Sequence, residues 1–224
     1  MGRRLLLLLA GLGLAACGDD DPGGPDTVLV EGQVISSRSG APVADASVNI
    51  GNLIAGPFVE TSTDAEGRFS AMVDVSVCGG VHILVNHPDY TQPAPFPDVC
   101  PGTSRVIEVQ PAAVSIVIAP QDPSVPVGGT VDFTAHVTYV DGTEDENGAA
   151  FWVIAAGPDI GDPLVCGSFP PSVVVQGITY TAPATPPPAE CGAAAGQVLV
   201  VAYPEAGFGS NVEASDTVIV TVTP

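Results

Sequence analysis

Oxygen-bearing side chains alternate along one short segment, in Asp141, Thr143, Asp145 and Asn147. Alternating oxygen ligands are typical of a calcium loop. In the register of a twelve-residue calcium loop, however, Thr143 takes the first position and Ile154 replaces the bidentate glutamate. A turn between two strands therefore explains the segment better. Weak calcium binding by Asp141 and Asp145 is the alternative, and calorimetric titration with calcium would test it. We predict no other metal site.

The remaining residues that could do chemistry do not form a catalytic pattern. The chain has no Gly-x-Ser-x-Gly nucleophile turn, and no serine, histidine and aspartate follow one another around such a turn. His82 and His87 lie close in sequence, but they have no obvious third metal ligand. The 25 acidic residues could supply a carboxylate pair for hydrolysis, but small β-sandwiches leave little room for a deep cleft. We therefore predict no catalytic residue, no cofactor and no enzyme activity, with a hydrolase as the least favoured alternative.

The first 17 residues have the layout of an export signal. Arg3 and Arg4 precede an apolar run over residues 5–14, and small residues then lead to Cys17. This order resembles a bacterial lipoprotein signal, which implies removal of residues 1–16 and lipidation of Cys17. A spanning helix would need about 20 apolar residues, and an ordinary secretory signal would not need a cysteine at the cut. Gly18, in place of the aspartate that favours inner-membrane retention, points to the outer membrane of the bacterial envelope.

Four further cysteines, an even number, suit the oxidising compartment that such a signal implies. Three pairings are possible. Because two cysteines fall in each half of the mature chain, we favour Cys78–Cys100 and Cys166–Cys191. Each disulfide would close a loop of roughly 20–25 residues and stabilise the fold by about 3 kcal/mol. A zinc site is the alternative, and the absence of a C-x-x-C spacing disfavours it.

Charge and composition exclude some partners and indicate the fold class. The chain has no lysine, and after Cys17 its 25 acidic residues outnumber three arginines by 22. Such a surface repels nucleic acid and anionic lipid, so the acyl chains on Cys17 are the predicted membrane link. Short runs of valine, isoleucine and threonine separated by glycine, proline and aspartate predict an all-β fold. Alternation of apolar and polar residues predicts inward faces over residues 28–34, 46–50 and 131–139, and Val114, Ile116 and Ile118 begin a further strand. Turns are predicted at residues 37–40 and at residues 63–67, before Phe69.

The mature chain divides into an acidic tether and two predicted β-sandwich domains. Residues 17–26 form the tether, and residues 27–109 form the first domain. Three segments of this domain carry a family pattern: Gly32-Gln33-Val34, Gly40 to Val48, and Thr63 to Phe69. They resemble the carboxypeptidase regulatory-like domain, which implies a transthyretin-like β-sandwich. The resemblance is to this accessory domain and not to a peptidase.

A hinge at residues 110–112 is predicted to lead into the second domain, residues 113–224. The segments 127–130, 138–143, 180–183 and 218–222, together with Trp152, resemble bacterial immunoglobulin-like domains of the group 2 kind. The resemblance implies a spacer, an adhesion module or a glycan-binding module. Segment 157–188 is longer and richer in proline than in a plain repeat, and the cysteines do not flank the tryptophan as in antibody domains.

Aromatic residues in the segment from His87 to Cys100 could form a platform for sugar rings. Tyr90 and Phe96 are the predicted glycan contacts, and their burial at the end of the sandwich is the alternative. Taken together, the sequence predicts an all-β chain of two consecutive β-sandwich domains after a lipoprotein signal peptide. The predicted function is adhesion or binding, to a polysaccharide or to another envelope protein. The alternative is a structural spacer or accessory subunit with no ligand of its own.

Overall fold

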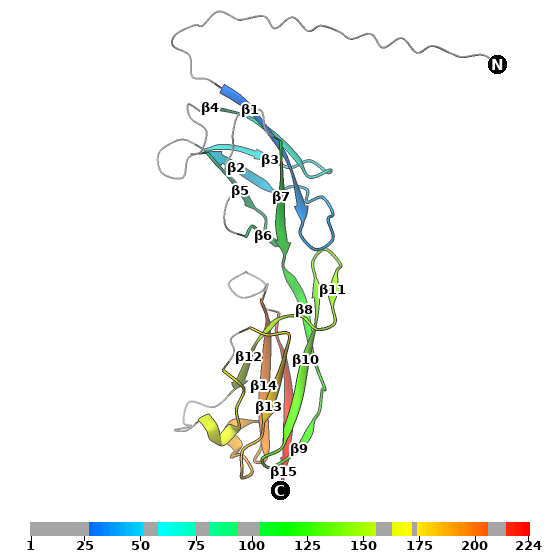
Figure 1. Ribbon diagram of the computed structural model, residues 1–224, viewed down its shortest axis with the longest axis vertical. Coiled ribbons are helices and arrows are strands. Elements are labelled where there is room, and N and C mark those ends of the chain that lie inside the picture. The colour runs from blue at the N-terminus through cyan, green and yellow to red at the C-terminus, as the bar shows by residue number, and fades with distance from the viewer. Residues whose placement is uncertain are drawn as a thin grey trace, which may run out of the picture.

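The computed structural model describes residues 27–51, 58–74, 81–93, 104–155, 163–171, 174–205 and 214–224. Cys17, Cys78, Phe96 and Cys100 therefore lie outside the described residues. The molecule is all-β, as predicted, and its strands form two successive sandwiches along one long axis (Figure 1). No helix within the described ranges has the length and apolar character needed to cross a bilayer.

The first sandwich packs a four-stranded sheet, in the order β4-β1-β7-β6, against a three-stranded sheet, in the order β3-β2-β5. β1 pairs antiparallel with β4 and parallel with β7. Its core is built from the inward side chains that the alternating pattern predicted, such as Val30, Val48 and Ile50, which are fully buried. The strands are β1 (Thr27–Ser36), β2 (Ser47–Gly51), β3 (Val59–Ser62), β4 (Arg68–Asp74), β5 (His82–Asn86), β6 (Tyr90–Thr91) and β7 (Ser104–Pro111).

The turn predicted before Phe69 is present and has a clear local cause. The Asp64 carboxylate accepts hydrogen bonds from the backbone N–H groups of Glu66 and Arg68 at 3.0 and 2.7 Å. Gly67 has φ +71°, and a Cβ there would lie 2.5 Å from the Val34 carbonyl oxygen. Glycine is therefore required at this position, both for the backbone conformation and for space.

The second sandwich also has two sheets. One has the order β11-β10-β13, with β8 on the other edge of β10, and the other has the order β12-β14-β15-β9. Alternate residues of β10 from Phe133 to Tyr139 are buried, and Trp152 stacks on Phe133 with ring centroids 6.1 Å apart. The strands are β8 (Ala113–Ala119), β9 (Ser124–Pro126), β10 (Thr130–Tyr139), β11 (Glu144–Asp145), β12 (Ala150–Ala155), β13 (Gly177–Thr181), β14 (Gln197–Pro204) and β15 (Asp216–Thr223).

β8 departs from the alternation expected for Val114, Ile116 and Ile118. Ile116 and Ile118 are buried, whereas Val114 is 49% exposed and Ala113 is fully buried. The register of β8 against β10 shifts between Thr138 and Tyr139, so Val114 has no directly opposed partner. An irregularity of this kind reverses the side-chain alternation, which the local pattern alone could not reveal.

One end of the second sandwich is closed by the predicted Cys166–Cys191 disulfide, whose Cα atoms are 5.3 Å apart. It joins two short 3₁₀ helices, η1 (Pro163–Cys166) and η2 (Ala189–Cys191). Both cysteines are fully buried, and the Tyr180 hydroxyl donates a hydrogen bond of 2.8 Å to the Cys166 carbonyl oxygen. The other predicted pair, Cys78–Cys100, stays a prediction.

Candidate functional site

A single residue, Ala112, connects the last strand of the first sandwich, β7, to the first strand of the second, β8. Its N–H donates to the Asp89 carbonyl oxygen in the first sandwich at 2.8 Å, and its own carbonyl accepts from the Val140 N–H in the second at 2.9 Å. The predicted hinge at residues 110–112 is therefore largely strand: Gln110 and Pro111 pair with β6, and Ala112 is 3% exposed. Because both backbone groups of Ala112 are bonded, this segment is not a free hinge.

The turn after β1 brings the first sandwich to this junction. The N–H of Ser36 donates to the Ala41 carbonyl at 2.8 Å, and the N–H of Gly40 donates to the Ser36 carbonyl at 2.9 Å. Gly40 has φ +69°, a conformation that glycine adopts without strain. The predicted turn over residues 37–40 is thus confirmed, and it places Arg38 at the tip that faces the second sandwich.

A hairpin of the second sandwich meets this turn. β10 ends at Tyr139 and the chain returns in β11, so the predicted turn at residues 141–143 is confirmed. Gly142 has φ +78°, and the Tyr139 N–H donates to the Thr143 carbonyl at 2.9 Å. The Asp141 carboxylate accepts from both the N–H and the hydroxyl of Thr143, at 3.1 and 2.6 Å. Asp141 therefore holds the turn that presents it.

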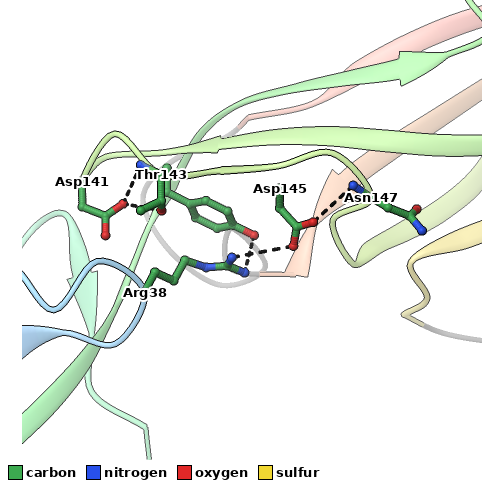
Figure 2. Close-up of polar contacts among 6 residues, drawn as sticks. Arg38, Asp141, Thr143, Asp145 and Asn147 are labelled. Atoms are coloured by element: carbon green, nitrogen blue, oxygen red, sulfur yellow. Dashed lines mark hydrogen bonds and ion pairs between the residues drawn. The ribbon is translucent and has the colours of Figure 1, made fainter.

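Arg38 makes three contacts with this hairpin (Figure 2). Its Nη2 donates to the Tyr139 hydroxyl at 2.6 Å, and its Cζ lies 3.7 Å from the centroid of the same ring. Its Nη1 lies 3.7 Å from Oδ2 of Asp145. Tyr139 is 4% exposed and belongs to the core of the second sandwich, so Arg38 stacks on a ring that is itself fixed. A planar guanidinium suits such stacking, whereas the compact ammonium of lysine does not.

A second contact joins Ser36 to Asp141 beside the arginine. The Ser36 hydroxyl donates to Oδ2 of Asp141 at 2.6 Å, and Ser36 is 1% exposed. Burial raises the pKa of Asp141, but hydrogen bonds from the hydroxyls of Ser36, Thr143 and Ser39 outweigh it and hold the pKa at about 2. The carboxylate is therefore charged at all but strongly acidic pH.

The distribution of charge along the chain explains why the arginine comes from the first sandwich and the acidic side chains from the second. The chain has no lysine or arginine from Ala112 to its last residue, so the acidic hairpin can obtain a lysine or arginine partner only from the first sandwich. Burial raises the pKa of the Tyr139 hydroxyl, and Arg38 opposes that rise. Arg38 thus supplies the guanidinium that the second sandwich, with no lysine or arginine, cannot provide.

The structure puts the calcium candidates Asp141 and Asp145 in this contact. Both oxygens of Asp141 accept hydrogen bonds from protein groups. One oxygen of Asp145 accepts from the Asn147 N–H at 3.2 Å, and the other faces Arg38. Within the part of the chain that the structure describes, no three histidine, cysteine or acidic side chains gather as metal ligands. The calcium role stays a prediction.

The predicted glycan contact Tyr90 lies on the first sandwich next to the junction. Its ring is half-buried against the first core and meets the ring of His87 edge-on, with centroids 5.1 Å apart. Burial, followed by the charge of Asp141, raises the pKa of its hydroxyl. An open cleft of about 540 Å³ lies beside it, lined by residues that include Asn86, His87 and Thr91.

Sequence reasoning missed the role of Ser36 and Arg38. One signal was available: Arg38 is one of only three basic residues after Cys17. In a strongly acidic chain, a rare arginine is expected to lie close to an acidic side chain. The pattern did not reveal which acidic segment would receive it, because Arg38 and Tyr139 are 101 residues apart.

None of the protein-family models compared with the chain matches it. No curated protein matches it either.

Several solved structures share part of the arrangement. BcpA, the major pilin subunit of Bacillus cereus, has a TM-score of 0.38 and 12% identity, over 88% of this chain and 69% of that one. A DUF3823 family protein from Bacteroides ovatus has a TM-score of 0.31 and 12% identity, over 87% of this chain and 98% of that one. Domains 4 and 5 of the S-layer protein SbsC give a TM-score of 0.33 and 13% identity, over 66% and 67%. At TM-scores below 0.5, these likenesses assign the chain neither a fold family nor a function.

Proposed function

We propose that this protein is a non-catalytic, lipid-anchored protein of the bacterial envelope. Acyl chains on Cys17 would hold it to the membrane, more readily the outer than the inner one. Residues 27–109 and 113–224 would act as two domains that together form an adhesion or binding module. The ligand class we favour is a polysaccharide or another envelope protein.

The observation that carries this proposal is the junction at Ala112. β7 of the first sandwich leads into β8 of the second with only Ala112 between them, and the backbone groups of Ala112 bond one sandwich on each side. Side-chain contacts from Ser36 and Arg38 add to this connection. A binding surface held in a fixed orientation loses less conformational freedom when it engages a ligand. The arrangement therefore suits presentation of a surface at a distance from an anchor.

The anchor is tested on the full chain and on a Cys17→Ser variant. We expect mass spectrometry of the purified full chain to find an acylated N-terminal cysteine and the membrane fraction to hold the protein. The serine variant should move to the soluble fraction. An intact N-terminal methionine on the purified native protein would refute the anchor.

Binding is tested by co-sedimentation of the full chain with purified peptidoglycan and by retention on immobilised polysaccharides. Because the Tyr90 ring packs on the first core, Tyr90→Ala is expected to lower the melting temperature as well. Asn86→Ala is the cleaner variant, since this exposed side chain lines the neighbouring cleft. Retention that Asn86→Ala weakens, without a change in melting temperature, would support a glycan site in the cleft. Equal retention of the two proteins would refute that site.

The direct connection of β7 to β8 through Ala112 also favours a second candidate, a structural spacer or accessory subunit with no ligand of its own. A spacer differs from a binding module in whether it is retained on a polymer. A spacer is retained on none of these polymers, yet a variant without the anchor should still disrupt the envelope complex to which it belongs. A broad hydrolase screen of the purified chain addresses the remaining alternative.

A further inference from the structure

We propose that the contact between the Ser36–Gly40 turn and the Tyr139–Asp145 hairpin is a lock that holds the two sandwiches as one rigid body. Arg38 is the residue that keeps this lock closed. The lock restrains motion of the two sandwiches whether or not the protein binds a ligand.

The apolar cores do not themselves join the sandwiches. Their buried residues form two separate clusters, one built from β1–β7 and the other from β8–β15. Domains that lack a large shared apolar interface are expected to move relative to each other. Rigidity in this molecule must therefore come from the strand through Ala112 and from the side chains beside it.

These two elements restrain different motions. The strand through Ala112 fixes the distance between the sandwiches, but one extended segment can still act as a pivot. The lock lies beside that segment, where the turn after β1 approaches β11 (Figure 1). A second attachment displaced from a pivot opposes bending and twisting about it. Removal of the lock would leave the pivot and free those motions.

Arg38 is the part of the lock that other residues cannot replace. It contacts the buried Tyr139 ring through stacking and through a hydrogen bond, and it faces Asp145 as well. Its side chain is only 32% exposed. Without it, the hairpin has no arginine or lysine partner, because its own half of the chain contains neither residue. The contacts of the Ser36 and Ser39 hydroxyls with Asp141 would remain, but bonds to one carboxylate restrain orientation less than a stacked guanidinium.

The experiment measures the spread of distances between the sandwiches in the full chain. Spin labels are placed at S62C on β3 and T217C on β15, two exposed strand positions. Labelling is done without reductant, and the chain without these substitutions shows the background. Double electron–electron resonance then compares the labelled parent with Arg38→Ala. The matched control is Arg68→Ala, which removes another exposed arginine, on β4 of the first sandwich.

We expect one narrow distance distribution for the parent and for Arg68→Ala, and a distribution at least about twofold broader for Arg38→Ala. Tyr139→Phe keeps the ring but loses the hydroxyl acceptor, so an intermediate width is expected. Circular dichroism and Trp152 fluorescence check that each variant is folded. If Arg38→Ala fails to fold, Tyr139→Phe decides, and an unchanged width then overturns the proposal. A parent as broad as Arg38→Ala, or an Arg38→Ala as narrow as the parent, overturns it directly.

Discussion

Replacing Asp141 by asparagine removes the charge that the junction stabilises, together with one of the two oxygens that accept hydrogen bonds. The side chain keeps its size and one oxygen, but it can no longer be ionised. The pKa of Asp141 is held at about 2, against an ordinary value of 3.8. Each unit of difference corresponds to about 1.4 kcal/mol, so the shift sets an upper limit of about 2.5 kcal/mol. Because the carboxylate is partly exposed to water, we expect a loss of only about 1 kcal/mol in the free energy of unfolding at neutral pH.

The sign of the pH dependence follows from the direction of the shift. A carboxyl group whose pKa is lowered by folding stabilises the protein above its unfolded pKa, and this stabilisation disappears as the pH falls through the folded pKa. The difference between the parent and Asp141→Asn should therefore be constant from neutral pH down to about pH 4 and shrink between about pH 4 and pH 2.

The assay is urea unfolding followed by the fluorescence of Trp152, the single tryptophan, which lies in the core of the sandwich that contains Asp141. Asp122→Asn controls for the loss of one negative charge, because Asp122 is exposed beyond the end of β8 that is farther from Ala112. A difference that is the same at pH 7 and pH 2, or that is absent at pH 7, would refute the reasoning. So would an equal effect of Asp122→Asn.

The disulfide, a close-packed glycine and a hydrogen-bonded side-chain amide each stabilise the fold by an amount that can be measured. Reduction of Cys166–Cys191, which spans 25 residues, should destabilise the second sandwich by about 3 kcal/mol in calorimetry; an unchanged melting temperature contradicts this. Gly32→Ala should cost about 1–3 kcal/mol in thermal unfolding, because the new Cβ would lie 2.5 Å from both the Phe69 ring and the Arg105 carbonyl oxygen. A neutral substitution would show that both the ring and this stretch of backbone can move away. Gln92→Ala should cost about 1–2 kcal/mol, because the amide bonds a backbone donor and a backbone acceptor of β5 at 2.6 and 3.1 Å; hydrogen exchange of β5 equal to that of the parent would contradict it.

Local sequence pattern predicted most of the fold. Alternation of apolar and polar residues indicated the inward faces of β2 and β10, because side chains in a strand point to opposite faces in turn. Glycine and aspartate indicated the turns at residues 63–67 and 141–143, since these residues allow or hold the required backbone conformation. The even number of cysteines, two in each half, indicated the Cys166–Cys191 disulfide.

The junction could not be predicted in the same way. Ser36 and Asp141 are 105 residues apart in the chain, and their contact exists only because two sandwiches with separate cores meet end to end. Alternation also failed at Val114, where the register shift depends on the neighbouring strand. The sequence by itself determined the strands, the turns and the scarcity of positive charge. Only the tertiary structure decided where Arg38 is used, because local patterns carry no information about which distant surfaces the folded sandwiches bring together.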